Sequence, residues 1–339
     1  MGYAQEKKEQ DNIKKRIKIY GILVATIMGA ILSILGLFGV FSGLQYRIGA
    51  PSIDARENGE MRMHFLNVGQ GDSTLIELPD GKVALIDSGN GSKSANQALL
   101  RQLYALKIKE IDYLIITHVD NDHAGGVKEL LQYKKVKRAY LPFVTENDYD
   151  YDILLSTITE KDVPYYTACP PDVSRVETLL SVTDGQYPYT FAFLYPTTEM
   201  VDNGATQTDS NALSSVLWLD YQGTSTLFMG DAPQEIEHKL ILDDNLGLFE
   251  RYGVTLSQTE ILKVSHHGSA DATSQALLDY IHAETAIISC GKDNAYQHPN
   301  SDVVERLVGA GVDVYRTDVQ GTIVISVKQD GAYQAFGVN

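Results

Sequence analysis

A short polar segment carries four side chains of the types that bind metal ions. His118, Asp120, Asp122 and His123 fall within six residues of segment 117–126. Two nitrogen/oxygen pairs on one tight loop can point in two directions, which suits two neighbouring metal ions better than one. Hydrolytic sites of that kind hold ions about 3.5–4 Å apart and act on both the attacking and the leaving oxygen. The alternative is a polar surface loop with stray histidines.

The surrounding residues predict the elements that position this segment. A largely apolar run, residues 111–116, in which Asp112 is the one charged residue, leads into the ligands and is typical of a buried strand. Two glycines and a periodic apolar segment follow, and they predict a loop that passes into a helix. The ligands therefore belong at the carboxyl end of a central strand, where α/β sheets usually place their sites.

Two later apolar runs also end in ligand-type residues. Residues 226–229 enter Gly230-Asp231, and residues 261–264 open into Ser265-His266-His267-Gly268. A single carboxylate can neutralise and space two dications with its two oxygens. Paired histidines rarely serve packing alone. These segments therefore predict further ligands for the same centre.

The pattern Thr-His-x-Asp-x-Asp-His-x-Gly-Gly at 117–126 resembles the signature of the metallo-β-lactamase superfamily. Asp120, where most members carry His, resembles the β-lactamase-like domain of the ComEC competence proteins. Segments 67–73 (Asn-Val-Gly-Gln-Gly-Asp-Ser), 85–89 (Leu-Ile-Asp-Ser-Gly) and 266–269 (His-His-Gly-Ser) resemble the same domain. The resemblance runs from about Met61 to the C-terminus. It implies an α/β fold, a four-layer αββα sandwich, which suits two successive halves of strands and helices.

The resemblance also implies a ligand set in which Asp231 bridges two metal ions. The first ion would take His118, Asp120 and Asp231; the second would take Asp122, His123, Asp231 and one residue of the His266/His267 pair. The sequence does not decide between these two histidines. Our working assignment makes His266 a metal ligand and His267 catalytic, with Asp122 also catalytic as the residue that orients the water. Asp87 would support the metal loop, and the superfamily's third histidine is missing, because no His lies between His123 and His238.

Three residues are predicted to contact the substrate. Asn211 and Ser214 form an Asn-x-x-Ser segment like that of ComEC-type domains, although an ordinary turn is the alternative. His298, in Gln297-His298-Pro299, resembles the Gly-His-Pro that closes the family site. We predict a catalytic and substrate-binding role for His298, with an ordinary loop histidine as the alternative.

An aspartate-rich ligand set is harder than a histidine-rich zinc site. We therefore expect two divalent ions, Mn²⁺ or Zn²⁺, with Mg²⁺ also acceptable. The preferred reaction is hydrolysis of a phosphodiester, with single-stranded DNA the leading substrate by resemblance. One alternative is a cell-envelope phosphodiesterase acting on phosphocholine or teichoic acid, since an acidic surface with 20 tyrosines suits a choline head group. A tethered binding module without catalysis is another.

The net negative charge of the chain argues against general electrostatic attraction to nucleic acid. The 339 residues have a formal net charge of −16. Residues 1–60 hold 8 basic and 6 acidic side chains, which leaves 20 basic and 38 acidic residues, a net charge of −18, for the rest. Lys134, Lys135, Lys137 and Arg138 form a basic cluster that is either a solvated helix end or a contact for an anionic substrate. Cys169 and Cys290 are too few for a disulfide framework, though one bridge remains open.

Domain boundaries follow from the N-terminal composition. Residues 1–18 form a basic tail, residues 19–44 contain no charged side chain, residues 45–60 predict a linker, and residues 61–339 form the hydrolase domain. About twenty apolar residues span a bilayer, so we expect an uncleaved single-pass anchor through 19–44, with a buried core helix as the alternative. The basic flank predicts a cytoplasmic N-terminus and an extracytoplasmic domain. Full ComEC proteins carry a many-helix channel where this chain has one span, and no obligate protein partner is inferred.

Overall fold

The computed structural model describes residues 2–37, 43–48, 54, 56–145, 148–172, 175–205 and 209–338. The chain divides into two compact units, Met1–Ile48 and Gly49–Asn339. Each unit is described by itself.

The first unit consists of helices α1 (Gly2–Leu37) and α2 (Leu44–Arg47). A 26-residue stretch of α1, Lys8–Ser33, is long and apolar enough to cross a bilayer and has none of its surface buried. The helix therefore includes both the basic tail and most of the apolar run predicted as the anchor, 19–44. The end of that run, residues 38–42, lies outside the described residues, and the anchoring role stays a prediction.

The second unit contains two sheets. The first sheet has eight strands in the order β14 (Tyr333–Val338), β13 (Thr322–Val327), β1 (Met61–Phe65), β2 (Thr74–Glu77), β3 (Val83–Ile86), β4 (Glu110–Ile115), β5 (Lys135–Leu141) and β6 (Tyr165–Thr167). The second has six strands in the order β12 (Asp313–Arg316), β11 (Thr285–Ile288), β10 (Ile261–Lys263), β9 (Thr224–Phe228), β8 (Val216–Tyr221) and β7 (Thr190–Tyr195).

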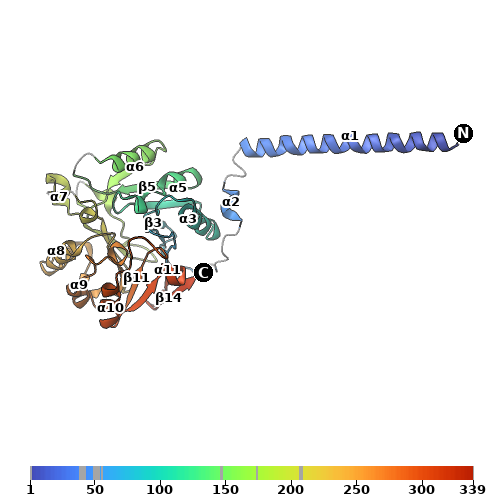
Figure 1. Cartoon of the computed structure of the whole chain (residues 1–339). Helices are drawn as coiled ribbons and strands as arrows, with labels where there is room; N and C mark the ends of the chain where they lie inside the picture. The colour runs from blue at the N-terminus through green and yellow to red at the C-terminus, as the bar shows by residue number, and fades with distance from the viewer. Residues whose placement is uncertain are drawn as a thin grey trace. The chain divides into compact units, whose positions relative to one another are not determined.

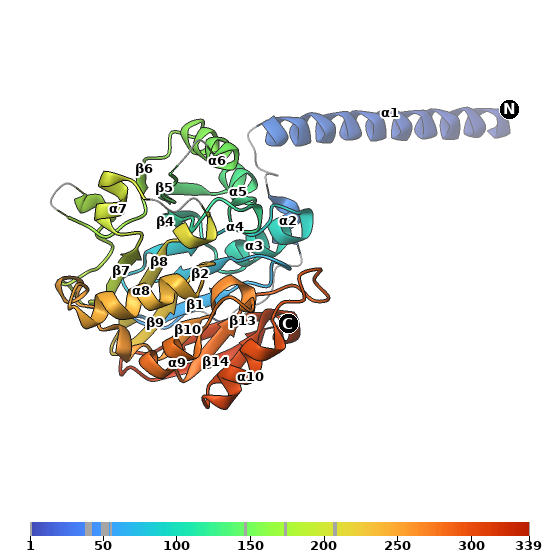
Figure 2. The same cartoon turned by 60° about the vertical axis from the view of Figure 1, so that its left-hand side comes forward.

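Helices cover the outer face of each sheet. On the side of the first sheet lie α3 (Lys93–Ala105), α5 (Val127–Tyr133) and α6 (Tyr149–Thr159); on the side of the second lie α8 (Gln234–Asn245), α9 (Gln275–Ile281) and α10 (Ser301–Gly309) (Figure 1). Short helices α4 (Asn121–Ala124), α7 (Thr198–Asn203) and α11 (Thr317–Gln320) complete the set. In Figure 2 strands of both sheets lie between the two helix layers. The predicted αββα sandwich is thus confirmed.

Two apolar cores hold the layers together. The first fills the space between the sheets, where Phe65 of β1 and Phe228 of β9 stack with ring centroids 6.2 Å apart. The second lies under α8, α9 and α10 and includes Leu240, Leu277 and Leu307, none of which is exposed. Burial of both faces of the second sheet explains its continuous apolar strands, because such strands have no solvated side on which to alternate.

Strand direction places the predicted ligands at one edge of each sheet. Strands β3, β4 and β5 run parallel, and so do β9, β10, β11 and β12. The loops that leave β3, β4, β9 and β10 at their carboxyl ends carry Asp87, the 117–126 segment, Asp231 and the His266/His267 pair. Topology thus gathers residues far apart in the sequence, as α/β sheets commonly do.

One expectation about local structure needs correction, and one open question is resolved. The acidic composition of residues 146–152 predicts a loop, but α6 begins at Tyr149. Asp148 caps this helix by accepting hydrogen bonds from the backbone N–H groups of Asp150 and Tyr151, and acidic residues in a first turn favour the helix dipole. The bridge left open between the two cysteines is absent, since both are buried free thiols.

Candidate metal centre

His123 is oriented by Asp87, the buried residue that follows β3. One oxygen of Asp87 accepts a hydrogen bond from the backbone N–H of Thr117, and the other accepts from the Thr117 hydroxyl and from His123 Nδ1, each at 2.8 Å. Because Nδ1 donates to Asp87, the neutral ring of His123 has its lone pair on Nε2. This is the supporting role expected for Asp87.

His118 and His267 have the same arrangement. His118 Nδ1 lies 3.1 Å from Thr117 Oγ1, whose own proton goes to Asp87, and His267 Nδ1 donates to the carbonyl of Ser289 at 2.9 Å. Both side chains are buried. Each therefore presents an Nε2 lone pair toward the interior of the site, as metal-ligating histidines do.

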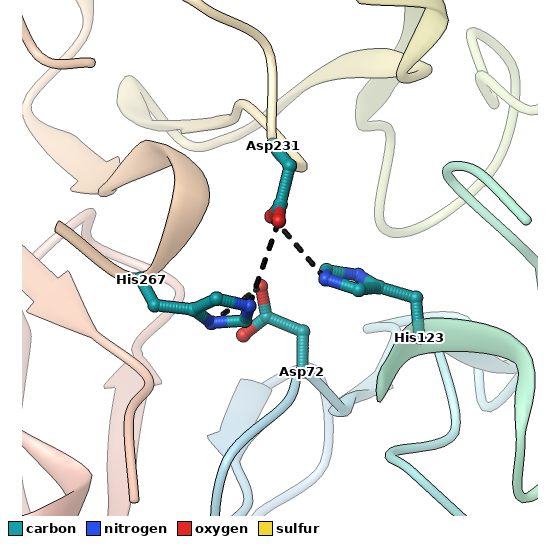
Figure 3. A group of neighbouring side chains, drawn as sticks. All are labelled: Asp72, His123, Asp231 and His267. Atoms are coloured by element: carbon teal, nitrogen blue, oxygen red, sulfur yellow. Dashed lines mark ion pairs between the residues drawn. The ribbon is translucent and has the colours of Figure 1, made fainter. Parts of the chain in front are cut away.

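Asp231, just beyond the end of β9, faces both His123 and His267 (Figure 3). Its oxygens are 3.2 Å from His123 Nε2, 3.5 Å from His267 Nε2 and 3.9 Å from His118 Nε2. Two ligand atoms about 2.1 Å from a shared ion at a tetrahedral angle lie about 3.4 Å apart. The spacing around Asp231 is therefore suited to ligands that share ions.

Asp120 and Asp122 contact different histidines of the cluster. Asp120 Oδ2 is 3.9 Å from His118 Nε2, while its Oδ1 accepts a hydrogen bond from the Ser210 hydroxyl at 2.8 Å. Asp122 Oδ2 is 3.3 Å from His267 Nε2. The division of the segment's ligands between two ions stays a prediction, because the rings of His118 and His123 lie close together, with centroids 4.1 Å apart.

The geometry favours the opposite assignment of the two adjacent histidines. His267 is buried and pairs with both Asp122 and Asp231. The side chain of His266 is 23% exposed, with Nε2 3.8 Å from Asp231 and Nδ1 3.4 Å from Asp271. His267 is therefore the better metal ligand, and His266 lies toward the open side of the site.

The three predicted substrate residues have different surroundings. The ring of His298 is half-buried, with its centroid 5.5 Å from that of His266 and 6.1 Å from that of His267. Ser214 is fully buried, and its hydroxyl accepts a hydrogen bond from the backbone N–H of Asp231, so it positions that carboxylate and is shielded from substrate. Asn211 begins a 3₁₀ turn (Asn211–Leu213), and its Oδ1 is buried without a hydrogen-bond partner.

Two residues that the ligand prediction omitted complete the centre. Asp72 is buried in the loop between β1 and β2, and it offers an oxygen within 4.8 Å of ligand atoms of His123, Asp231 and His267. Its Oδ2 accepts a hydrogen bond at 2.7 Å from Lys263, a buried lysine that ends β10. The sequence placed the Gln70-Gly71-Asp72 segment only within a motif of the resemblance. The spacing of residues along the chain does not predict how deeply such a loop is buried in the site.

Gly71 allows this loop to approach the metal segment. Its φ is +135°, and a Cβ there would lie 2.4 Å from the carbonyl oxygen of Asp122. That same carbonyl accepts a hydrogen bond from the backbone N–H of Asp72 at 3.0 Å. Only glycine permits this close contact.

The electrostatics of the cluster are those of a site built for cations. Burial and the neighbouring His123 lower the pKa of His118 to about 4, so its ring is neutral at pH 7. Burial opposes ionisation of Asp122, but the neighbouring His267 and the charge of His123 outweigh it and lower the pKa to about 2. Burial also opposes ionisation of Asp231, yet His123 and His267 hold its pKa well below the usual value. The carboxylates are thus ionised at neutral pH.

His123 responds in the opposite direction. Burial lowers its pKa, but the carboxylates of Asp231 and Asp87 outweigh burial and hold the pKa well above its usual value. The ring is therefore protonated when no other cation is present. Binding of a metal must displace this proton, so metal affinity should weaken as the pH falls.

Unpaired buried atoms test whether the residues present fit a metal. The Nε2 atoms of His118, His123 and His267 and Oδ1 of Asp231 are all buried without a hydrogen-bond partner. Buried polar atoms are normally paired, so several orphaned lone pairs facing one point need another partner. A divalent cation meets that need, and the donor set fits one.

The basic cluster plays no part in this centre. Lys135 and Lys137 pair with Glu110, and Lys137 also pairs with Asp112. Lys134 is buried over the ring of Tyr104, 3.7 Å from its centroid. These residues begin β5, whereas the metal loop follows the other end of the adjacent parallel strand β4. The cluster therefore lies toward the opposite end of the sheet from the loops that carry the predicted ligands.

Comparisons with known proteins agree with this geometry. Residues 66–150 match the family model described as "Metallo-beta-lactamase superfamily". The chain is 30% identical over 281 residues to ComE operon protein 3 of Bacillus subtilis, with 78% of this chain and 33% of that protein covered. It is 31% identical over 268 residues to Recombination protein 2 of Haemophilus influenzae (78% and 29% covered) and 24% identical over 278 residues to Competence protein ComA of Neisseria gonorrhoeae (82% and 34% covered). The chain thus spans about a third of the length of these relatives.

Replacement of Asp87 by Asn should weaken metal binding about 10- to 100-fold, because the carboxylate that fixes the tautomer of His123 is lost. Titration calorimetry with Mn²⁺ and Zn²⁺ measures the effect. Glu77→Gln is the matched control: Glu77 pairs with His64 at 3.0 Å, in a carboxylate–histidine contact outside the cluster. Equal metal affinity in Asp87→Asn and the unaltered chain would contradict the ligand role of His123.

Lys263→Met should lower the free energy of unfolding by about 3–5 kcal/mol in EDTA, since it leaves the buried Asp72 without a counter-charge. The double variant Lys263→Met/Asp72→Asn should recover most of this loss. Urea unfolding followed by fluorescence of Trp218, the single tryptophan, measures both. Lys239→Met, which breaks a partly exposed pair with Asp243, should cost less than about 1 kcal/mol. Additive losses in the double variant would show that Lys263 and Asp72 do not act as a pair.

Proposed function

Because the chain carries a metallo-β-lactamase superfamily domain of the ComEC type, we propose that it is a metal-dependent hydrolase of phosphodiesters, with DNA or a related polymer as substrate. The observation that carries the proposal is the set of buried, unpaired lone pairs that loops of both sheets direct at Asp231. Such a centre suits hydrolysis of an anionic ester, whose charge needs cations to offset it.

Charge balance supports two divalent ions. Five aspartates lie in or beside the cluster, Lys263 is the one buried cation paired with them, and the histidines act as neutral ligands. The five aspartates are Asp72, Asp87, Asp120, Asp122 and Asp231. The remaining charge of about −4 is equal in magnitude to the charge of two divalent cations. One ion alone would leave an excess of negative charge, much of it on the buried Asp72, Asp87 and Asp231, which is costly.

The ligands divide into two groups around Asp231. His118 and Asp120 would hold one ion with Asp231. His123, His267 and Asp122 would hold the other with Asp231. In this proposal His267 takes the ligand position that the sequence analysis gave to His266. Oxygen ligands predominate on the first ion, which favours Mn²⁺ or Mg²⁺ there, while the two imidazoles of the second group also suit Zn²⁺.

A bound metal pair supplies an activated water at neutral pH and Lewis-acid stabilisation of the phosphate. The chain's own residues do the rest. Asp122, ionised and 30% exposed, can accept a proton from a water and so orient it. His298 and His266, on the open side, can donate hydrogen bonds to phosphate oxygens. Burial of the other ligands excludes bulk water from the back of the site, where low dielectric strengthens these contacts.

The nature of the substrate rests on the relatives. Of the three relatives, one is named a recombination protein, one a competence protein and one a ComE operon protein, and this chain covers about a third of each. DNA is therefore the substrate we propose. The acidic domain predicts weak, local binding of that polymer at the site, in place of an extended basic groove.

We also propose that α1 anchors the chain in a membrane, with the N-terminus cytoplasmic and the hydrolase outside. The span Lys8–Ser33 supports the anchor, and the lysines concentrated before residue 19 support the orientation. The substrate would then be an extracytoplasmic polymer.

Activity should require a divalent metal and both Asp122 and Asp231. Asp122→Ala and Asp231→Ala should each lower kcat/KM at least about a hundredfold, because each removes a ligand and, for Asp231, the residue between the two groups. The assay uses bis(p-nitrophenyl) phosphate, single-stranded DNA and a phosphocholine ester, each with Mn²⁺, Mg²⁺ and Zn²⁺ and after EDTA.

Asp279→Ala, an exposed aspartate of α9, is the control and should retain full activity. Turnover of the phosphocholine ester alone would favour an envelope esterase. No turnover with any metal, together with no bound metal, would favour a binding module.

The full chain should sediment with membranes and resist extraction by alkaline carbonate, whereas a chain without residues 1–48 should be soluble. The reason is the apolar length of α1, which matches a bilayer. Cell fractionation and protease treatment of spheroplasts measure attachment and orientation. Recovery of the full chain in the soluble fraction would rule out the anchor, and protection of the domain from external protease would reverse the orientation.

A further inference from the structure

A row of three aromatic rings runs from the metal centre to the surface. The ring of His298 stacks on that of His267 with centroids 6.1 Å apart and planes at 27°, and the ring of Tyr296 stacks on His298 at 5.8 Å, also at 27°. His267 is buried, His298 is half-buried, and Tyr296 is 69% exposed. The outer end of the row is thus a large aromatic face open to solvent beside the site.

The loop that carries Tyr296 is held in shape by its own hydrogen bonds. The side-chain amide of Asn294 donates to the carbonyls of Gly291 and His298 and accepts from the His298 backbone N–H. The backbone N–H of Gly291 donates to Gln70 Oε1, which ties the loop to the segment that carries Asp72. A ligand that meets Tyr296 therefore meets a surface that is already ordered, so little entropy is lost on binding.

The charge of the domain makes a non-ionic contact valuable. With a net charge of −18 beyond residue 60, the domain gains little from general attraction to phosphates. Stacking of a base on an aromatic ring does not depend on net charge and tolerates any base sequence. The charge of Lys292, exposed on the same loop, is balanced by the adjacent exposed Asp293, so the loop itself adds no net attraction for phosphate.

We propose that Tyr296 is a base-stacking subsite, which binds an unpaired base of a single-stranded nucleic acid whose phosphodiester lies at the metal centre. This rests on the proposed function and names its substrate class. The rings of Tyr296 and His298 are already at stacking distance, so no base fits between them, and the base stacks on the outer face of Tyr296. Bases of a duplex are paired and stacked on one another, so a duplex cannot use this subsite.

The experiment compares two fluorescent 10-mers with identical backbones, oligo(dT) and an abasic oligomer, on the full chain in detergent. Binding is followed by anisotropy with Ca²⁺, and cleavage with Mn²⁺. The unaltered chain should bind oligo(dT) about 5- to 150-fold more tightly than the abasic oligomer. In Tyr296→Ala and Tyr296→Leu this preference should vanish, whereas Tyr296→Phe should keep it, because only a ring provides a stacking face.

Equal binding of the two oligomers by the unaltered chain would overturn the subsite, as would an unchanged preference in Tyr296→Ala or equally tight binding of a duplex. A preference that Tyr296→Leu retains would also overturn it, because apolar contact would then suffice. The proposed function fails separately: it fails when no phosphodiester is cleaved, whether or not binding depends on the bases.

Discussion

The site depends on a row of three side chains, Asp87–His123–Asp231, that crosses from one sheet to the other. Asp87 follows β3 of the first sheet, His123 lies on the segment that follows β4 of the same sheet, and Asp231 follows β9 of the second sheet. The imidazole is held by one carboxylate and faces the other. Each of the other ligands is positioned relative to this row, because His118 shares Thr117 with Asp87 and His267 shares Asp231 with His123. The packing of the two sheets therefore determines the geometry of the centre.

This arrangement joins metal binding to stability. Buried carboxylates concentrate around Asp231, and Lys263 is the one buried lysine among them. The acids around His123 hold its pKa high, so without metal its proton compensates part of this negative charge. A divalent ion replaces that proton with a stronger counter-charge. The free energy of metal binding then becomes part of the free energy of folding.

Sequence reasoning predicted the layers and most of the residues that the structure gathers around Asp231, because strands that end in polar residues carry local signals. It missed the contact between Asp72 and Lys263, which are 191 residues apart and whose pairing depends on how two loops meet. It could not orient His266 and His267, since adjacent side chains on an irregular loop follow no fixed period. It took the start of α6 for a loop, because acidic residues that cap a helix are also typical of solvated turns. The predicted anchor and the ligand roles remain to be tested.

The His266/His267 turn explains why this part of the centre escapes pattern analysis. Both residues have positive φ, 48° and 53°, a region that costs a non-glycine residue roughly 1–2 kcal/mol. The hydrogen bonds from His266 N–H to the Gly230 carbonyl and from Ser269 N–H to the His266 carbonyl hold the turn against that strain. In regular structure, neighbouring side chains diverge. Here the strained backbone brings both rings within 4 Å of Asp231, so one buried and one open imidazole serve a single carboxylate.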